Sequence, residues 1–243
     1  MKAVIVLKVG KGSTVSMTCR FIHWIGANKR IFWFAGFAGV YIGYFLLQQF
    51  VQPQYIIHTA LDDQIPFCEW FVIPYLLWYL YISIPLIIAF FKASKTDFIL
   101  MSLLLFSGIA VSMALFALWP TMVDFRPTGF DRDNILIDLV RMIYAADRPT
   151  NVCPSLHCYE ALAMHIGMVR SGFFKNSRSV LRPVSVLMLG LICLSTMFIK
   201  QHSVVDVAAG LVLAAPMYLL VYKQIMPLLV RHCVAPGERL IDG

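Results

Sequence analysis

Long apolar runs are the feature that most restricts how this chain can fold. Ile31 to Phe50 carries no charged residue and has roughly the 20 residues that a helix needs to cross a bilayer. Five further apolar stretches follow: 70–91, 98–120, 155–169, 184–199 and 204–222. Hydrophobic residues make up 60% of the 243-residue chain, against about 45–50% in soluble domains. The sequence therefore predicts an all-α integral membrane protein, a bundle of six transmembrane helices.

The placement of charge predicts how the bundle is oriented. Lys and Arg exceed Asp and Glu by +7, an excess that would suggest nucleic acid or anionic lipid if it were clustered on one surface. All but five of the 20 Lys and Arg residues instead fall in segments on one side of the expected spans; the exceptions are Arg126, Arg132, Arg141, Arg148 and Lys200. Basic segments remain cytoplasmic. We therefore expect cytoplasmic termini in a multi-pass protein, of the plasma membrane, and no nucleic-acid partner.

Three segments follow from these assignments. We expect a basic cytoplasmic segment over 1–30, a membrane domain over 31–226 and a cytoplasmic tail over 227–243. The long outer loop before the fourth span carries apolar residues at helical spacing: Ile135, Leu136, Leu139, Val140 and Ile143. This pattern predicts a short amphipathic helix lying against the membrane surface.

Polar residues that suggest chemistry concentrate between Arg141 and Asp206. Ionisable groups in or beside membrane segments are costly and are usually functional. His202 and Asp206 are four residues apart, so at the start of a helix they share a face. The carboxylate can then fix one ring nitrogen and leave the other as a nucleophile or base. Such a pair can also be purely structural.

A second group stands where the outer loop enters the fourth span. Ser155 is a natural helix cap, and the first-turn N–H groups behind it form an anion site. His157 would lie beside an anion bound there. The less specific alternative is that Ser155 only caps the helix. The expected topology places this turn and the turn holding His202 on the same face, so His157 and His202 can meet.

Two arginines in the outer loop could reach the same point. Arg141 and Arg148 are seven residues apart, which is two helical turns. Pro149 disfavours helical conformation at Arg148 and could aim that side chain out of the loop. Both arginines could equally form surface ion pairs with the aspartates around them.

Together these residues resemble three signatures of the type 2 phosphatidic acid phosphatase superfamily. The first runs from Arg141 to Arg148-Pro149, the second is Pro154-Ser-Leu-His157, and the third comprises Ser195, His202 and Asp206. The resemblance covers about the carboxy-terminal half of the chain. It implies a six-span enzyme with its site on the outer face, which agrees with the topology inferred from charge.

The resemblance implies a role for each matching residue. His202 would be the nucleophile that forms a phosphohistidine, Asp206 its orienting carboxylate, and His157 the acid that protonates the leaving alcohol. Arg141, Arg148 and Ser155 would bind the phosphoryl oxygens. No metal or cofactor is implied, because cations and helix N–H groups can neutralise the transferred phosphoryl group. The expected substrate is a lipid phosphate or a polyprenyl pyrophosphate.

Two departures from the family pattern qualify this assignment. Arg141 stands where the first signature usually has Lys, and Thr196 where the third usually has Arg. Lys200, two residues before His202, is the candidate replacement for the missing cation. The branch resembling inositol-phosphorylceramide and sphingomyelin synthases commonly lacks the same Arg. A phospho-head-group transferase is therefore the first alternative to a phosphatase.

Further alternatives remain open. A transporter or scaffold could use the polar cluster as a substrate path, although no internal repeat supports it. A zinc site built from Cys153, His157, Cys158 and His202 has no paired Cys-x-x-Cys. Cys68 could form a disulfide with Cys153 in an oxidising compartment. The oligomeric state does not follow from the sequence.

Overall fold

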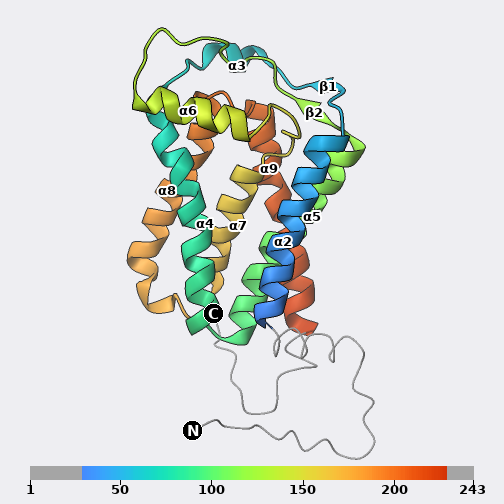
Figure 1. The fold of residues 1–243 in the computed structure, drawn as a ribbon. Coiled ribbons are helices and arrows are strands. Elements are labelled where there is room, and N and C mark those ends of the chain that lie inside the picture. Colours follow the sequence, from blue (N-terminus) through green and yellow to red (C-terminus); the bar gives the residue numbers. More distant parts are fainter. Residues whose placement is uncertain (1–28, 229–243) are drawn as a thin grey trace, which may run out of the picture.

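The computed structural model describes residues 29–228, which form a bundle of long helices. Figure 1 shows α2 running up the bundle and α9 running back down, so both reach the end opposite α3 and α6. We call the end that carries α3 and α6 the capped end. The expected segment 1–30 and tail 227–243 lie almost entirely outside the described residues.

The elements follow one another along the chain. The helices are α2 (Lys29–Phe50), α3 (Ala60–Gln64), α4 (Val72–Lys92), α5 (Lys95–Leu118), α6 (Ile135–Ala146), α7 (Leu156–Arg170), α8 (Arg178–Phe198) and α9 (Val204–Tyr218). Shorter turns are η1 (Glu69–Phe71), η2 (Lys175–Ser177) and the π-helical η3 (Leu219–Ile225), which continues α9. Strands β1 (Tyr55–Ile56) and β2 (Thr121–Met122) pair in parallel and join the two loops of the capped end.

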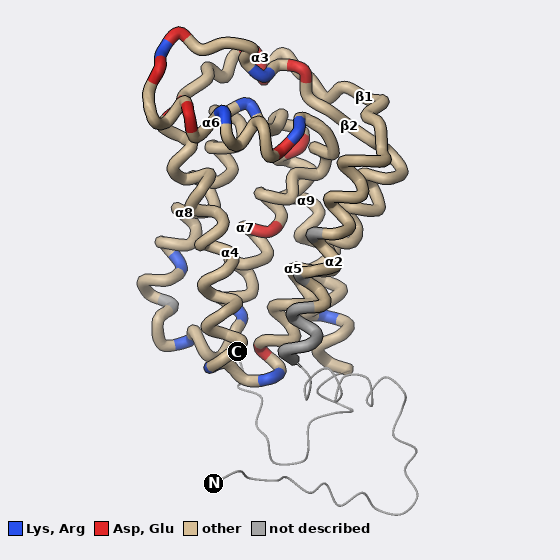
Figure 2. The backbone as a smooth tube through the Cα atoms, viewed as in Figure 1, with Lys and Arg blue, Asp and Glu red and all other residues tan. Residues whose placement is uncertain are grey.

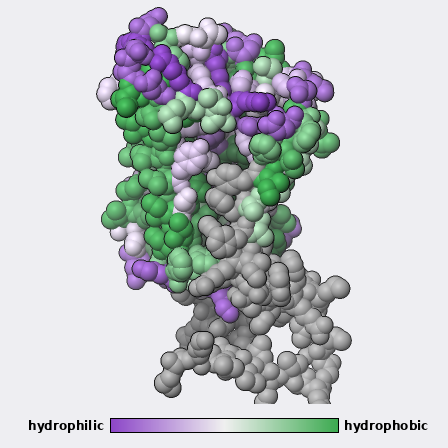
Figure 3. All heavy atoms as spheres, viewed as in Figure 1, coloured by the Kyte–Doolittle hydropathy of each residue, from purple (hydrophilic) through white to green (hydrophobic). Residues whose placement is uncertain are grey.

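Four of the helical segments are long and apolar enough to cross a membrane: Glu69–Lys92, Lys95–Leu118, Ser179–Phe198 and Val204–Leu228. Figure 3 shows apolar residues along the flank of the bundle and hydrophilic residues at the capped end. The protein is therefore a mostly helical membrane protein. Among the described residues, α2 and α7 do not meet the same criterion of helix length and hydropathy. The count of six spans therefore stays a prediction.

Helix α7 lies at the centre of the bundle, packed against α4, α5, α8 and α9. Its 15 residues extend about 22 Å, less than the roughly 30 Å of a bilayer core. Buried small residues, Ala161, Ala163 and Gly167, let neighbouring helices approach it. α7 thus holds its first turn, with His157, inside the bundle below the capped end.

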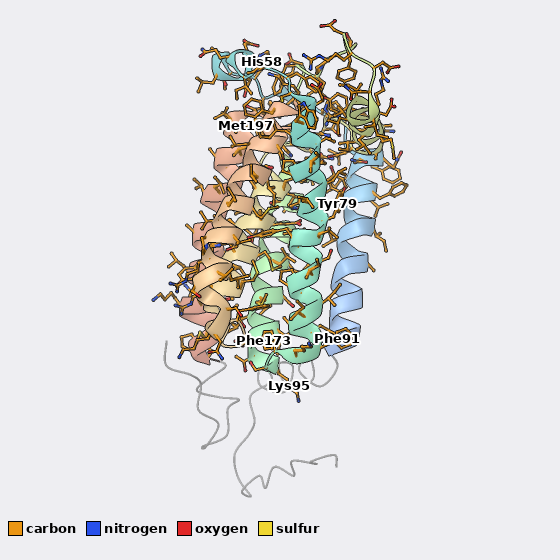
Figure 4. The ribbon with its side chains drawn as sticks, turned by 90° about the vertical axis from the view of Figure 1, so that its left-hand side faces the viewer. His58, Tyr79, Phe91, Lys95, Phe173 and Met197 are labelled. Carbon is orange, nitrogen blue, oxygen red and sulfur yellow. The ribbon has the colours of Figure 1, made fainter. Side chains whose placement is uncertain are left out.

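Charged residues divide between the two ends. Figure 2 shows most acidic residues at the capped end, and mainly Lys and Arg at the opposite end. Ser94 caps α5 by accepting a hydrogen bond from Asp97 N, and Lys95 is exposed beside it (Figure 4). The basic end is the one that the charge pattern assigns to the cytoplasm.

Helix α6 occupies the loop in which an amphipathic helix was expected. Asn134 caps it by accepting hydrogen bonds from Leu136 N and Ile137 N. Val140 and Ile143 are buried, as is Ile137, whereas Met142 is exposed. The contact of α6 with a membrane surface remains a prediction.

Helix α8 begins at Arg178, six residues before the predicted start at Val184. The sequence predicted an apolar span from Val184, after the basic residues that end with Arg182, but proline is tolerated near the start of a helix. Pro183 lies in the second turn of α8, where it costs one hydrogen bond near the helix start. At its other end, α8 stops at Phe198, just before the turn that holds His202.

Candidate active site

Two histidines from distant parts of the chain meet at the capped end. His157 is the second residue of α7, and His202 lies in the turn between α8 and α9. His157 Nδ1 is 3.2 Å from His202 Nε2, and both residues are buried. The sequence-predicted meeting of these histidines is therefore present in the structure.

Asp206, in the first turn of α9, stands behind His202. Its Oδ2 lies 3.5 Å from His202 Nδ1, an ion-pair distance that is long for a hydrogen bond. The same oxygen accepts a hydrogen bond of 2.9 Å from Ser203 N. Catalytic hydrogen bonds are often long before substrate binds. Within residues 29–228, His202 Nδ1 has no hydrogen-bond partner. A proton on Nδ1 directed to Asp206 would leave the lone pair on Nε2, which faces His157 Nδ1.

Ser155 links the turns that carry the two histidines. Its backbone N–H donates to the carbonyl oxygen of Asp206 at 3.0 Å. Its hydroxyl accepts from Cys158 N at 3.5 Å, as expected for a helix cap. Since Ser155 N is already used, the N–H groups left to bind an anion at the start of α7 are those of Leu156 and His157.

Arg126 is a cation near the histidines. Its guanidinium donates to the main-chain oxygen of Asp147 at 2.7 Å and to Gln201 Oε1. The Nε atom is buried and has no partner within residues 29–228. Burial lowers the pKa of Arg126, and the nearby Asp147 opposes that shift. An arginine remains charged under such conditions, and its charge acts on His157.

Tyrosines hold Asp147 beside Arg126. Tyr44 donates to Asp147 Oδ1 at 2.8 Å, and Tyr75 lies 3.4 Å from Oδ2. The Arg126 guanidinium carbon lies 4.7 Å from the centroid of the Tyr144 ring. The Tyr144 hydroxyl donates to Ile199 O at 2.7 Å. Arg126 is therefore fixed in place by groups from α2, α4, α6 and the 199–203 turn.

Aromatic rings from α4 enclose His157. The Tyr75 and Trp78 rings lie 4.8 Å and 4.6 Å from the His157 ring, measured between centroids. Tyr75 is buried. These rings exclude water from the histidine pair, which strengthens electrostatic interactions there.

The structure does not bring Arg141 or Arg148 to the histidine pair. Exposed Arg141 donates to Asp133 at 2.7 Å and to Asp138 at 2.9 Å. Arg148, also exposed, donates to Gln48 O at 3.3 Å. Arg141 thus forms the surface ion pairs given as the alternative from the sequence, whereas Arg148 bonds to a main-chain oxygen. The phosphate-binding role predicted for these two residues has no support in these contacts.

Lys200 is buried and engaged elsewhere. Its ammonium donates to the main-chain oxygens of Asp62, at 2.7 Å, and Ile65. Thr196 is fully buried, and its hydroxyl donates to Cys193 O at 2.9 Å. Lys200 thus joins its turn to the α3 segment, whereas Thr196 bonds within α8, and neither presents a free cation to the histidines.

The cysteines do not form the disulfide or zinc site considered from the sequence, although Cys153 interacts with the Asp206 side chain. Cys158 Sγ is 4.0 Å from Thr196 Oγ1, so the thiol faces α8. Cys68 and Cys153 are both free thiols. Within residues 29–228, no group of three or more His, Cys, Asp or Glu side chains is arranged to hold a metal ion.

Sequence reasoning missed Arg126 and its partners. The chain holds two Arg-Pro pairs in the outer loop, at 126–127 and at 148–149. Spacing to the second signature favoured the later pair, whereas the fold brings the earlier one to His157. No sequence motif marks Asp147, Tyr75 or Gln201. These residues are identifiable only from their contacts in the structure.

Comparisons of the chain with protein-family models, with curated proteins and with solved structures found no match. The site is therefore defined by its own geometry. That geometry consists of a buried histidine pair, a carboxylate behind one histidine and a partly buried arginine nearby, at one end of a membrane bundle.

Proposed function

We propose that the protein is a metal-independent phosphatase of lipid phosphates or polyprenyl pyrophosphates that works through a phosphohistidine, as the resemblance to the type 2 phosphatidic acid phosphatases suggests. The supporting observation is the contact of His157 with His202, backed by Asp206. A histidine with one nitrogen oriented by a carboxylate is an activated nucleophile. A second histidine at 3.2 Å is a proton donor for a leaving oxygen.

The first half-reaction would transfer the phosphoryl group to the protein. The lone pair on His202 Nε2 attacks phosphorus, the bond from phosphorus to the lipid oxygen breaks, and that oxygen takes a proton from His157. The 3.2 Å between the two nitrogens holds no phosphoryl group, so the rings must part when substrate binds. The Arg126 guanidinium and the N–H groups at the start of α7 would neutralise charge on the phosphoryl oxygens.

The second half-reaction would regenerate the histidine. Water gives a proton to His157 and attacks phosphorus, the phosphorus–nitrogen bond breaks, and inorganic phosphate leaves. A lipid alcohol in place of water would make the protein a transferase.

The location of the site suits an amphipathic substrate. His202 lies at the end of two helices, α8 and α9, that belong to the four membrane-crossing segments. A lipid in the bilayer would place its phosphate at this depth. By the charge pattern, the capped end is the outer face, and we propose a plasma-membrane protein with cytoplasmic termini.

Radiolabelling tests the proposal directly. Purified protein in detergent is given phosphatidic acid or a polyprenyl pyrophosphate labelled at the terminal phosphate, and free phosphate and protein-bound label are both counted. Label that is stable in base and labile in acid, lost in His202→Ala, supports a phosphohistidine. Turnover by wild-type protein without any such label, or label retained in His202→Ala, contradicts it. Adding diacylglycerol or ceramide as acceptor separates hydrolysis from transfer.

A further inference from the structure

A short outer segment is fastened to the turn that carries His202. Helix α3 belongs to the loop between α2 and α4, far from His202 in sequence, and Figure 1 shows it on top of the capped end. Lys200 of the turn donates to the main-chain oxygens of Asp62, within α3, and of Ile65, just beyond its end. The two segments therefore contact each other two residues before the proposed nucleophile.

The Asp62 carboxylate makes the return contact just after His202. Asp62 Oδ2 accepts from Ser203 Oγ at 2.7 Å, and Oδ1 accepts from Val204 N at 2.9 Å. The residue is 2% exposed. Burial by itself would raise the pKa of Asp62, but hydrogen bonds from Val204, Ser203 and Thr59 lower it overall. The carboxylate thus caps α9 from another part of the chain.

These contacts reach His202 through Ser203. Ser203 N donates to Asp206 Oδ2, the same oxygen that lies 3.5 Å from His202 Nδ1. A shift of Ser203 therefore moves the carboxylate that orients the imidazole. Asp62 itself touches neither histidine.

The backbone of the turn needs such support. Lys200 has φ 57°, in the left-handed region that costs a residue with a Cβ about 1 kcal/mol or more. Strained residues persist where the surroundings over-determine them. Here the surroundings are the end of α8, where Lys200 N donates to Met197 O and Gln201 N to Thr196 O. The two carbonyl groups of the α3 segment hold the ammonium in addition.

We propose that Asp62 and Lys200 form a clamp that positions His202 for attack, an inference that rests on the proposed function. Both are positioning residues, because they act through the turn and not on the substrate. The clamp replaces the phosphate-binding role that the sequence suggested for Lys200.

The first test is kinetic. Asp62→Asn and Lys200→Met should each lower kcat/KM by about tenfold or more and raise the inhibition constant of vanadate, a mimic of five-coordinate phosphorus, by a similar factor. Matched controls are Asp63→Asn, the exposed neighbour in α3, and Lys95→Met at the opposite end of the bundle (Figure 4). Both controls should stay near wild type. Lower turnover with unchanged KM and vanadate inhibition would indicate only a smaller folded fraction, and would overturn the clamp.

A double-mutant cycle separates the clamp from phosphate binding by Lys200. Partners in one clamp share one effect, so Asp62→Asn with Lys200→Met should be little worse than the more damaging single variant. If Lys200 binds phosphate instead, Asp62→Asn should stay close to wild type. The loss of kcat/KM in the double variant should then equal the product of the two single losses. That result would restore the sequence-based role.

The second test does not depend on activity. Diethylpyrocarbonate modifies accessible imidazoles, and His202 is 6% exposed. Peptide mass spectrometry should show His202 modified several-fold faster in Asp62→Asn than in wild type, with His165, which contacts Ser185, as internal reference. An unchanged rate at His202 overturns the clamp. If wild-type protein shows neither turnover nor label while this rate does rise, the proposed function fails and the clamp stands.

Discussion

Gly210 of α9 packs directly against the carbonyl oxygen of Ser155. A Cβ placed on Gly210 would lie 2.4 Å from that oxygen and 3.3 Å from Tyr159 N, both main-chain atoms. Because only glycine allows this approach, α9 can meet the first turn of α7. The hydrogen bond from Ser155 N to Asp206 O and the contact of His157 with His202 both depend on this closeness.

Gly210→Ala should therefore weaken both the fold and the site. Forcing a methyl group against main-chain atoms costs about 1–3 kcal/mol, and any relief must separate α7 from α9. We expect a lower thermal unfolding midpoint in detergent together with reduced lipid-phosphate turnover. Gly190→Ala is the matched control, because nothing lies within 4 Å of its added Cβ. Equal behaviour of the two variants would contradict this account of the helix contact.

Asp206→Asn should slow turnover by about 100-fold or more while leaving the protein folded. The amide keeps the shape of the side chain but no longer holds the Nδ1 proton of His202, so the attacking lone pair is lost. Initial rates on phosphatidic acid would measure the loss, and size-exclusion chromatography would check the fold. A rate within tenfold of wild type would argue against His202 as the nucleophile.

Arg126→Met and Arg148→Met distinguish the two Arg-Pro pairs. Removing one donor to a transition-state oxygen costs about 10²–10³ in kcat, and we expect that loss for Arg126→Met. Arg148→Met should have a small effect, because its side chain is exposed and bonded to Gln48 O. Steady-state kinetics of both purified variants would decide, and the reverse order of effects would favour the assignment made from the sequence.

The His58 side chain predicts a pH-dependent contribution to stability. Its ring nitrogens lie 2.8 Å from Asp63 Oδ1 and 2.8 Å from Asp124 Oδ1, which joins the two loops of the capped end (Figure 4). The hydrogen bond with Asp63, aided by Asp124, raises the pKa of His58 above 6.5. A raised pKa in the folded state means that the contribution is complete below pH 6.5 and is lost as the pH rises through the folded value.

Thermal unfolding of wild type and His58→Gln between about pH 5 and pH 9 would measure it. The difference in midpoint should be largest at the acid end and shrink towards the alkaline end. Wild type and His58→Gln carry the same carboxylates, so proton binding to carboxylates largely cancels in the difference. A difference that grows with pH would contradict the predicted sign.

Much of the bundle could be predicted because apolar length and charge are local properties of the sequence. The start of α9 at Val204 and the cap at Ser155 agree with the structure, since caps and apolar runs mark them directly. The contact of His157 with His202 followed from placing two turns on one face. Helix α8 starts six residues before the predicted span, because Pro183 is tolerated near a helix start.

The cation beside the histidines could not be predicted by the same reasoning. Arg126 is held there by Asp147 O, Gln201 and the Tyr144 ring of α6, which are tertiary contacts. Lys200 was expected to be a free cation, yet its partners are main-chain carbonyls of a segment more than 130 residues away. Hydrogen bonds to main-chain atoms leave no trace in side-chain spacing.

The stretch between β2 and α6 is suited to carrying an inserted tag. Gly129 is exposed, and nothing lies within 4 Å of an added Cβ, so this loop tip tolerates added length better than the tightly bonded 199–203 turn. An epitope placed after Gly129 would be reached by an antibody from only one side of a sealed vesicle. Such a tag would report which way the protein is inserted and would test the proposed outer location of the capped end.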